Sequence, residues 1–232
     1  MTRYFIAAAV TLAFTLLARA VRGVTTTGAI AGFIITFLLY ALAGPGAFAA
    51  LVMVFILAWI TTRIGYRQKQ KLGTAEKHDG RSASQVLANL GAAAVCAILF
   101  ASSKNSAFLL AISAALSEAA ADTVSSEFGQ ACSQKARLIT TWELVPAGTD
   151  GGITIAGTIA GAIAAAIISL VTASTGLIPW HWFWISTAAA ILGTLIDSLL
   201  GALLERKHRL NNDAVNFLST VAAAILALLL CL

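Results

Sequence analysis

Residues 105–126 read NSAFLLAISAALSEAAADTVSS, an apolar run long enough to cross a lipid bilayer as a helix. The run carries two carboxylates, Glu118 and Asp122, which are four residues apart and therefore on one face of that helix. A carboxylate at the bilayer centre costs on the order of 2.5–3.5 kcal/mol, which is tolerated mainly where the group has a function or a close partner. The segment therefore predicts a membrane protein with a polar site inside it.

The composition of the whole chain agrees with a membrane protein. Of the 232 residues, 59% are hydrophobic and 11% are charged, whereas soluble domains carry about 25% charged residues. The three cysteines have neither metal-ligand nor disulfide spacing. Because no polar stretch is long enough to fold separately, we expect residues 1–232 to form a single integral membrane domain.

Apolar runs separated by polar segments predict an all-α, polytopic bundle of about eight transmembrane helices, with seven as the alternative. The first two runs are shorter than the roughly 20 residues that a span needs, so either one could fail to cross fully. Two small-residue pairs, Gly28-xxx-Gly32 and Gly157-xxx-Gly161, predict close packing between helices. The expected spans are 4–18, 28–43, 47–64, 85–101, 105–126, 152–175, 180–203 and 213–232.

The basic residues indicate how the chain is oriented. With eight spans, one side of the membrane holds all but two of the 15 Lys and Arg residues, in the loops 19–27, 63–84, 127–150 and 204–212. The positive-inside rule makes these loops cytoplasmic and puts both termini outside. We therefore expect a multi-pass protein of a cell inner membrane or a thylakoid-type membrane, with its active face cytoplasmic. The scattered basic residues argue against a nucleic-acid partner.

Polar residues recur at helical spacing at the cytoplasmic ends of five spans, and orientation alone does not explain them. Stripes that face lipid would be costly, whereas stripes that face one another would build a polar cavity. For the Asn and Gln residues, the alternative to a place in the cavity is hydrogen bonding between helices. For Asp213, the alternative is capping the N-terminus of its helix. The stripes are Arg81, Gln85 and Asn89; Glu118, Asp122, Ser125 and Ser126; Asp150, Thr154 and Thr158; Thr194, Asp197 and Gly201; and Asp213, Asn216 and Thr220.

A glycine-rich segment, Gly148-Thr149-Asp150-Gly151-Gly152, precedes the sixth span. Glycines let backbone N–H groups approach an anion, and the N-terminus of a helix adds its positive dipole end. Basic residues on the same side can neutralise phosphate, and several Asp residues can hold a hard divalent cation. In a membrane setting, this combination predicts a Mg²⁺-dependent reaction on a lipid phosphate.

Five stretches resemble the membrane family of transmembrane protein 19 and the phytyl-phosphate kinases, which is domain-of-unknown-function family 92. The resemblance implies transfer of a phosphoryl group from a nucleoside triphosphate to an isoprenyl monophosphate such as phytyl phosphate. A fainter similarity to the dolichol kinase and phosphatidate cytidylyltransferase group makes CTP the favoured donor. The stretches are 80–89, 121–129, 148–158, 193–201 and 212–219.

On this basis we expect Asp122, with Asp150 or Asp197, to hold Mg²⁺ on the nucleotide phosphates, while Arg81 and the glycine-rich segment position them. The expected catalytic residues are Asp122, Arg81 and Asp150. The expected metal ligands are Asp122, Asp150, Asp197, Asp213 and Glu127. The expected nucleotide- or phosphate-binding residues are Gly148, Thr149, Gly151, Gly152, Thr154, Gln85, Asn89, Ser125, Ser126, Lys135, Asn212 and Asn216.

Three other functions stay open at this point. An isoprenol kinase would need a general base, which Asp122 or Glu127 could supply, whereas a monophosphate acceptor is already a nucleophile at neutral pH. A cytidylyltransferase that makes a CDP-lipid would use the same site. A transporter or lipid flippase would instead use intramembrane carboxylates to bind ions or protons. The sequence allows a homodimer but does not fix the oligomeric state.

Overall fold

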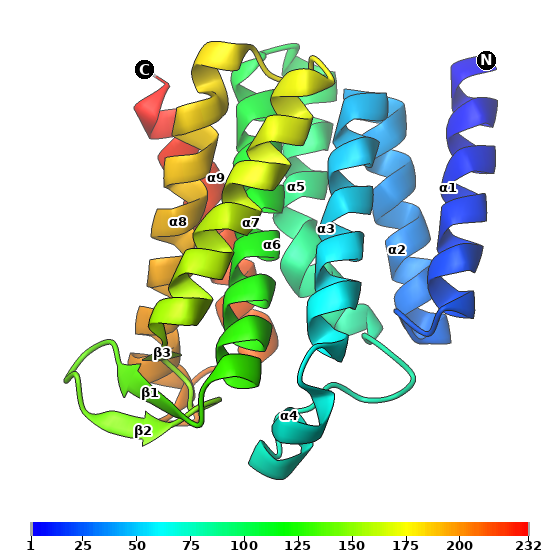
Figure 1. The fold of residues 1–232 in the computed structure, drawn as a ribbon. Coiled ribbons are helices and arrows are strands. Elements are labelled where there is room, and N and C mark those ends of the chain that lie inside the picture. Colours follow the sequence, from blue (N-terminus) through cyan, green and yellow to red (C-terminus); the bar gives the residue numbers. More distant parts are fainter. Residues whose placement is uncertain (1, 232) are drawn as a thin grey trace.

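The computed structural model describes residues 2–231, which form a bundle of long helices with a small sheet at one end (Figure 1). Two of the long helices continue as a short π-helical turn (η). The helices are α1 (Thr2–Ala20), α2 (Thr26–Leu38) with η1 (Leu39–Ala43), α3 (Pro45–Arg63), α4 (Tyr66–Leu72), α5 (Ala83–Ser103), α6 (Ala107–Cys132), α7 (Ile155–Ser174), the 3₁₀ turn η2 (Trp180–Trp182), α8 (Phe183–Leu200) with η3 (Gly201–Glu205), and α9 (Asn212–Leu230).

Within residues 2–231, eight helical segments are long and apolar enough to cross a membrane. The all-α bundle with eight spans is thereby confirmed. The second span is longer than the expected 28–43 because α2 begins at Thr26, and η1 continues it to the expected end at Ala43, just before the turn at Gly44-Pro45. At its other end, the Thr25 hydroxyl accepts the N–H of Gly28 (3.0 Å) and so caps the start of α2.

α6 is the central helix of the bundle. It packs against α3, α5, α7, α8 and α9, and it is buried without interruption from Leu110 to Ala121. Gly157 and Gly161 bring α7 directly onto its backbone, since a Cβ on these glycines would lie 2.5 Å from the Ser125 carbonyl oxygen and 2.8 Å from that of Ala121. The central position of α6 puts its two carboxylates inside protein rather than in lipid.

One end of the bundle carries the long loops, and we call it the loop end. It comprises residues 21–25, 64–82, 133–154 and 206–211, together with α4 and the sheet, at the bottom of Figure 1. α1 begins and α9 ends at the opposite end of the bundle (Figure 1). The polar stripes of the sequence all lead toward the loop end.

The segment expected to be a loop between α6 and α7 contains a small sheet that the sequence did not predict. Its strands are β1 (Lys135–Leu138), β2 (Leu144–Pro146) and β3 (Gly152–Ile153), and both neighbours pair antiparallel with β1. β1 alternates exposed and buried side chains over only four residues, which is too short a pattern to separate from a loop. The sheet anchors both ends of the glycine-rich segment.

Two expectations about helix ends were wrong. Arg81 is not on the helix of Gln85 and Asn89, because Ser82 and Gln85 form a capping box that starts α5 at Ala83. The backbone of Arg81 instead pairs with the α1–α2 loop: its carbonyl accepts the N–H of Thr25 (2.9 Å) and its own N–H donates to the Gly23 carbonyl (3.1 Å).

The other wrong helix start concerns Asp150; for Asp213, the place on the helix of Asn216 is confirmed and the alternative role as N-cap is wrong. Asp150 precedes α7, whose N-cap is Thr154, and so it lies on the loop rather than on a helical stripe. The N-cap of α9 is Asn211, whose side-chain oxygen accepts the N–H of Ala214 (2.9 Å), so Asp213 lies inside the first turn. In both cases a capping side chain stands close to the acid in sequence and defines the helix start.

Candidate functional site

A polar cavity of about 400 Å³ lies at the loop end. Its lining comes from α6, α8 with η3, the glycine-rich segment, residues 74–77 and the starts of α5 and α9. Most of the residues singled out in the sequence meet there. Those that line the polar cavity are Gln85, Asp122, Ser125, Ser126, Glu127, Gly148, Thr149, Asp150, Gly151, Gly152, Thr154, Asp197 and Asn212.

Two carboxylates from different helices meet in the polar cavity. Asp122 of α6 and Asp197 of α8 are close enough for direct electrostatic interaction, and one oxygen of Asp197, Oδ2, is buried without a hydrogen-bond partner in residues 2–231. Glu205 and Asp150 are close enough to interact electrostatically. Like charges at such short range repel, so a bound cation would stabilise this arrangement.

Mg²⁺ suits this donor set. It commonly takes one or two carboxylates from a protein and completes its octahedron with waters and substrate phosphates. Among residues 2–231, no group of three or more His, Cys, Asp and Glu side chains is arranged to hold a metal ion by itself. Asp122 and Asp197 therefore fit a Mg²⁺ ion whose coordination sphere is completed by phosphate oxygens of a substrate.

Glu118 lies one turn of α6 deeper than Asp122. Its side chain is 1% exposed, and neither carboxylate oxygen has a hydrogen-bond partner within the described residues. It is close enough to Asp122 and Asp197 for direct electrostatic interaction. A third carboxyl group is therefore buried behind the two that line the polar cavity.

The glycine-rich segment supplies backbone donors to the same cavity. Gly148 (φ +88°) and Gly151 (φ +74°) adopt the left-handed conformation, and a Cβ on Gly151 would lie 2.4 Å from that of Ala202. In residues 2–231, the N–H groups of Gly148, Asp150 and Gly151 donate to no other protein group. Asp150 and Gly151 are successive, and free N–H groups on successive turn residues form an anion-binding concavity. The segment thus fits phosphate oxygens.

Two cations stand at the side of the polar cavity that faces α5. Arg81 is close enough to Asp122 for direct electrostatic attraction, and both terminal nitrogens of its guanidinium lie 3.4 Å from the Thr123 hydroxyl. Lys77 lines the polar cavity itself. Arg81 lines a second, apolar cavity of about 350 Å³, which shares Glu76, Lys77 and Gln85 with the polar one.

Five expected residues lie outside the lining of the polar cavity, and Arg81, which lines only the apolar cavity, is one of them. Lys135 is exposed on β1, and Asp213 and Asn216 lie on α9. Asn89 donates to the Gln85 carbonyl (2.9 Å) and faces the apolar cavity instead. These residues therefore lie in the loop-end half of the bundle, as the site does, but they do not line the polar cavity.

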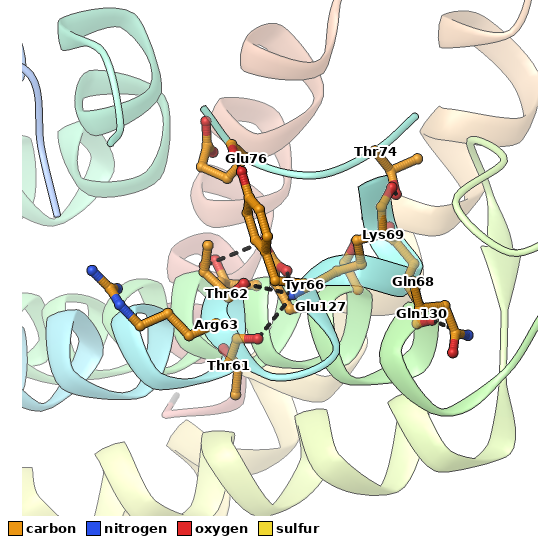
Figure 2. A network of polar contacts seen from close by, with 12 residues as sticks. Thr61, Thr62, Arg63, Tyr66, Gln68, Lys69, Thr74, Glu76, Glu127 and Gln130 are labelled. Atoms are coloured by element: carbon orange, nitrogen blue, oxygen red, sulfur yellow. Dashed lines mark hydrogen bonds and ion pairs between the residues drawn. The ribbon is translucent and has the colours of Figure 1, made fainter. Parts of the chain in front are cut away.

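Glu127 is already paired with a buried lysine (Figure 2). Lys69 of α4 is 0% exposed; its ammonium donates to the backbone carbonyls of Thr61 (3.0 Å) and Thr62 (2.8 Å) and forms an ion pair with Glu127. The Thr62 hydroxyl donates to the other Glu127 oxygen (3.2 Å). Because Lys69 compensates its charge, Glu127 is better suited to holding α4 against α6 than to binding a metal ion.

Three residues of this region were missed from the sequence. Glu205 lies eight residues beyond Asp197, and η3 keeps the helix continuous to that point, so the spacing of Asp197, Gly201 and Glu205 was a usable signal. Glu76 accepts a hydrogen bond from the Gln85 side chain (3.1 Å) and lines both cavities. Lys69 gave no signal, because a lysine in a basic loop is normally solvated.

Comparison with known proteins places the chain among membrane proteins. The model of a family described as integral membrane protein DUF92 matches residues 9–224. The uncharacterized membrane protein MJ0933 of Methanocaldococcus jannaschii is 37% identical over 235 residues, covering 99% of this chain and 95% of that protein. No solved structure matches.

Two further relatives are about 30% identical to the chain. The uncharacterized membrane protein sll0875 of Synechocystis is 31% identical, covering 82% of this chain and 76% of that protein. Protein VTE6, chloroplastic, of Arabidopsis thaliana is 30% identical, covering 90% of this chain and 66% of that protein. The chain is a multi-pass integral membrane protein and belongs to the DUF92 family.

Proposed function

We propose that this protein is a Mg²⁺-dependent phosphotransferase that moves a phosphoryl group from a nucleoside triphosphate, with CTP favoured, to an isoprenyl monophosphate such as phytyl phosphate. The observation that carries the proposal is the meeting of Asp122 and Asp197 with the free N–H groups of the glycine-rich segment in one cavity at a membrane surface. The resemblance to the phytyl-phosphate kinases supports the isoprenyl acceptor.

In this proposal, Asp122 and Asp197 hold the nucleotide through Mg²⁺, which would neutralise charge on the transferred phosphoryl group. The N–H groups of Gly148, Asp150 and Gly151 bind phosphate oxygens of the nucleotide. Arg81 and Lys77 orient the phosphate of the acceptor. The loop end is the cytoplasmic face, as its basic residues favour.

The reaction itself needs little covalent chemistry from the protein. An oxygen of the acceptor phosphate attacks the γ-phosphorus, the bond from that phosphorus to the β–γ bridging oxygen breaks, and the nucleoside diphosphate leaves. Because the second pKa of a phosphate monoester is near 6, the attacking oxygen is already deprotonated at neutral pH and no general base is required. Positioning and charge neutralisation supply the rate.

The test is turnover by purified protein with Mg²⁺, using phytol, phytyl phosphate or phosphatidate, each with CTP, ATP, UTP or GTP. An isoprenyl diphosphate together with a nucleoside diphosphate supports the proposal. Phosphorylated phytol would point to an alcohol kinase, and a CDP-lipid with pyrophosphate to a cytidylyltransferase. Absence of turnover in every combination would overturn the enzyme proposal, and uptake into liposomes would then test a transporter.

A matched pair of variants ties any activity to the polar cavity. Asp122→Asn removes one carboxylate charge from the cavity, and Glu143→Gln removes one from an exposed position at the tip of the sheet, where the Glu143 carboxylate accepts from the Thr141 hydroxyl (3.2 Å). We expect the first to abolish turnover and the second to preserve it.

A further inference from the structure

The apolar cavity lies between helices of the N-terminal part of the chain. α2 packs on α1 and α5, whereas α3 packs on α6 and α7, and the cavity occupies the space that this divergence leaves. Gly32 and Thr36 line it from α2, and Leu51, Val54 and Phe55 line it from α3. Its volume of about 350 Å³ is that of a small-molecule site.

The apolar cavity reaches well into the membrane-spanning part of the bundle. Thr36 is ten residues beyond the start of α2 at the loop end, and Leu51 is twelve residues before the loop-end terminus of α3. At 1.5 Å per residue these positions lie about 15 and 18 Å from the loop end, roughly half of the ~30 Å hydrocarbon thickness. A hydrocarbon chain entering from the loop end would thus be surrounded by protein at a depth where lipid chains normally lie.

The loop end of the same cavity is basic. Arg22, Arg63, Lys77 and Arg81 line it there, and Arg63 is fixed in place by donating to the Val21 carbonyl (2.9 Å) and by stacking on Trp59 (3.8 Å to the ring centroid). An apolar space closed by cations at one end matches an amphiphile with a hydrocarbon chain and an anionic head group.

The apolar cavity also adjoins the polar one. Lys77 and Gln85 line both cavities, and Arg81 lines the apolar cavity while lying beside Asp122 of the polar one. A head group held by Arg81 and Lys77 therefore stands next to the carboxylates and the glycine-rich segment. This is where an acceptor phosphate must lie to meet a nucleotide phosphate.

Gly32 has a specific consequence for the room in the apolar cavity. The sequence predicted that Gly28 and Gly32 would both serve close packing between helices, and neither does: a Cβ on Gly28 would lie 2.2 Å from the carbonyl oxygen of Arg81, in the segment before α5, whereas a Cβ on Gly32 would meet nothing within 4 Å. Gly32 lies about 9 Å along α2, midway down the cavity. A larger side chain at this position would fill the cavity without a clash.

We infer that the apolar cavity holds the hydrocarbon chain of the anionic lipid acceptor, with its phosphate at the junction with the polar cavity, and that Gly32 leaves the room that long chains need. The inference takes the isoprenyl nature of the chain from the proposed function. The binding surface itself does not depend on which reaction follows: it is cationic at the loop end and apolar toward the middle of the bundle.

The experiment measures binding of isoprenyl monophosphates of increasing length, geranyl, farnesyl and geranylgeranyl, to the full-length protein in detergent. The longest isoprenyl chain that still binds with wild-type affinity should become shorter from Gly32→Ala to Gly32→Leu to Gly32→Phe. For Gly32→Phe we expect geranylgeranyl monophosphate to bind about tenfold or more weakly, since losing two or three buried methylenes has that effect, while geranyl monophosphate binds as before. The control is Ile30→Phe on the lipid-facing side of α2, where Ile30 is 60% exposed.

A photoreactive group at the end of the geranylgeranyl chain gives an independent readout. Labelling of α2 and α3 near Thr36 and Leu51, lost in Gly32→Phe and kept in Ile30→Phe, would support the inference. Labelling confined to other helices, no specific labelling, or equal binding by both phenylalanine variants would overturn it. Binding that depends on chain length without any turnover would contradict only the proposed kinase activity. Turnover of geranylgeranyl monophosphate that is the same in Gly32→Phe as in the wild type would contradict only the placement of the hydrocarbon chain.

Discussion

The two cavities at the loop end have similar volumes, about 400 and about 350 Å³, and opposite chemistry. The polar cavity is built mainly from the second half of the chain and has carboxylates at its base. The apolar cavity is built mainly from α2, α3 and α5 and has cations at its loop end. The acidic space suits a cation with its bound phosphates, and the cation-closed apolar space suits an anionic lipid.

The residues common to both cavities show how the two could act together. Glu76, Lys77 and Gln85 line both, and the Gln85 side chain donates to Glu76 across the shared boundary (3.1 Å). Only a group at this boundary can contact both spaces. Phosphoryl transfer between a soluble nucleotide and a lipid phosphate requires such a boundary, whereas a transport path would run onward across the bilayer.

The largest effect is expected from removing a carboxylate of the polar cavity. Asp122→Asn should lower turnover by about 10³-fold, the size of loss typical when one group that stabilises developing charge is removed. Thermal unfolding should change little, because the substitution keeps the shape and the lost attraction to Arg81 is offset by the relief of repulsion from Asp197 and Glu118. Turnover within a few fold of the wild type would show that Asp122 does not hold the nucleotide.

A large effect on stability, rather than on chemistry, is expected at the buried ion pair beside the boundary. Lys69→Met leaves Glu127 without its partner and should cost about 3 kcal/mol in the free energy of unfolding. The double variant Lys69→Met/Glu127→Leu should recover much of that loss. Unfolding by a denaturing detergent measures both, and equal stability of single variant and wild type would mean that the pair does not fix α4.

An intermediate effect is expected at the boundary. Lys77→Met should raise KM for the lipid phosphate about tenfold with a smaller change in kcat, because it removes one charge-assisted contact with the acceptor phosphate. Lys71→Met, an exposed lysine at the end of α4 outside both cavities, is the matched control. A loss confined to KM for the nucleotide would assign Lys77 to the polar cavity alone.

The smallest effect is expected at a residue that the sequence put forward and the structure separates from the site. Lys135 is exposed on β1 and outside the lining of the polar cavity, so Lys135→Ala should leave kcat and both KM values within about twofold, as surface substitutions usually do. Steady-state kinetics at fixed salt check this. A loss as large as that of Lys77→Met would extend the phosphate site onto the sheet.

The spans and the carboxylates of the polar cavity were accessible from the sequence for one physical reason. A bilayer imposes length and hydropathy on each span, so Asp122 and Asp197 stand out as costly exceptions. Glu205 was missed because the expected span ended at residue 203, whereas the π-helical turn that extends α8 continues to Glu205. A π-helical turn depends on packing and has no clear signature in a single sequence.

The surroundings of the site were less predictable because they depend on contacts between distant segments. The burial of Lys69 requires two backbone carbonyls at the end of α3, which the chain reaches only by turning back on itself, and a carboxylate on α6 that is 58 residues away in sequence. Gly28 and Gly32 share a motif, yet only Gly28 meets the backbone of Arg81. Spacing identifies which residues share a helix face, but not what that face meets.

The most direct measurement of the central claim is binding of Mn²⁺, as a paramagnetic substitute for Mg²⁺, followed by electron paramagnetic resonance with and without CTP. Because Asp122 and Asp197 need phosphate oxygens to complete the coordination sphere, we expect weak binding of Mn²⁺ alone and tight binding in the presence of CTP. The double variant Asp122→Asn/Asp197→Asn should lose the CTP-dependent signal. An undiminished CTP-dependent signal in that variant would contradict the placement of the nucleotide and its metal in the polar cavity.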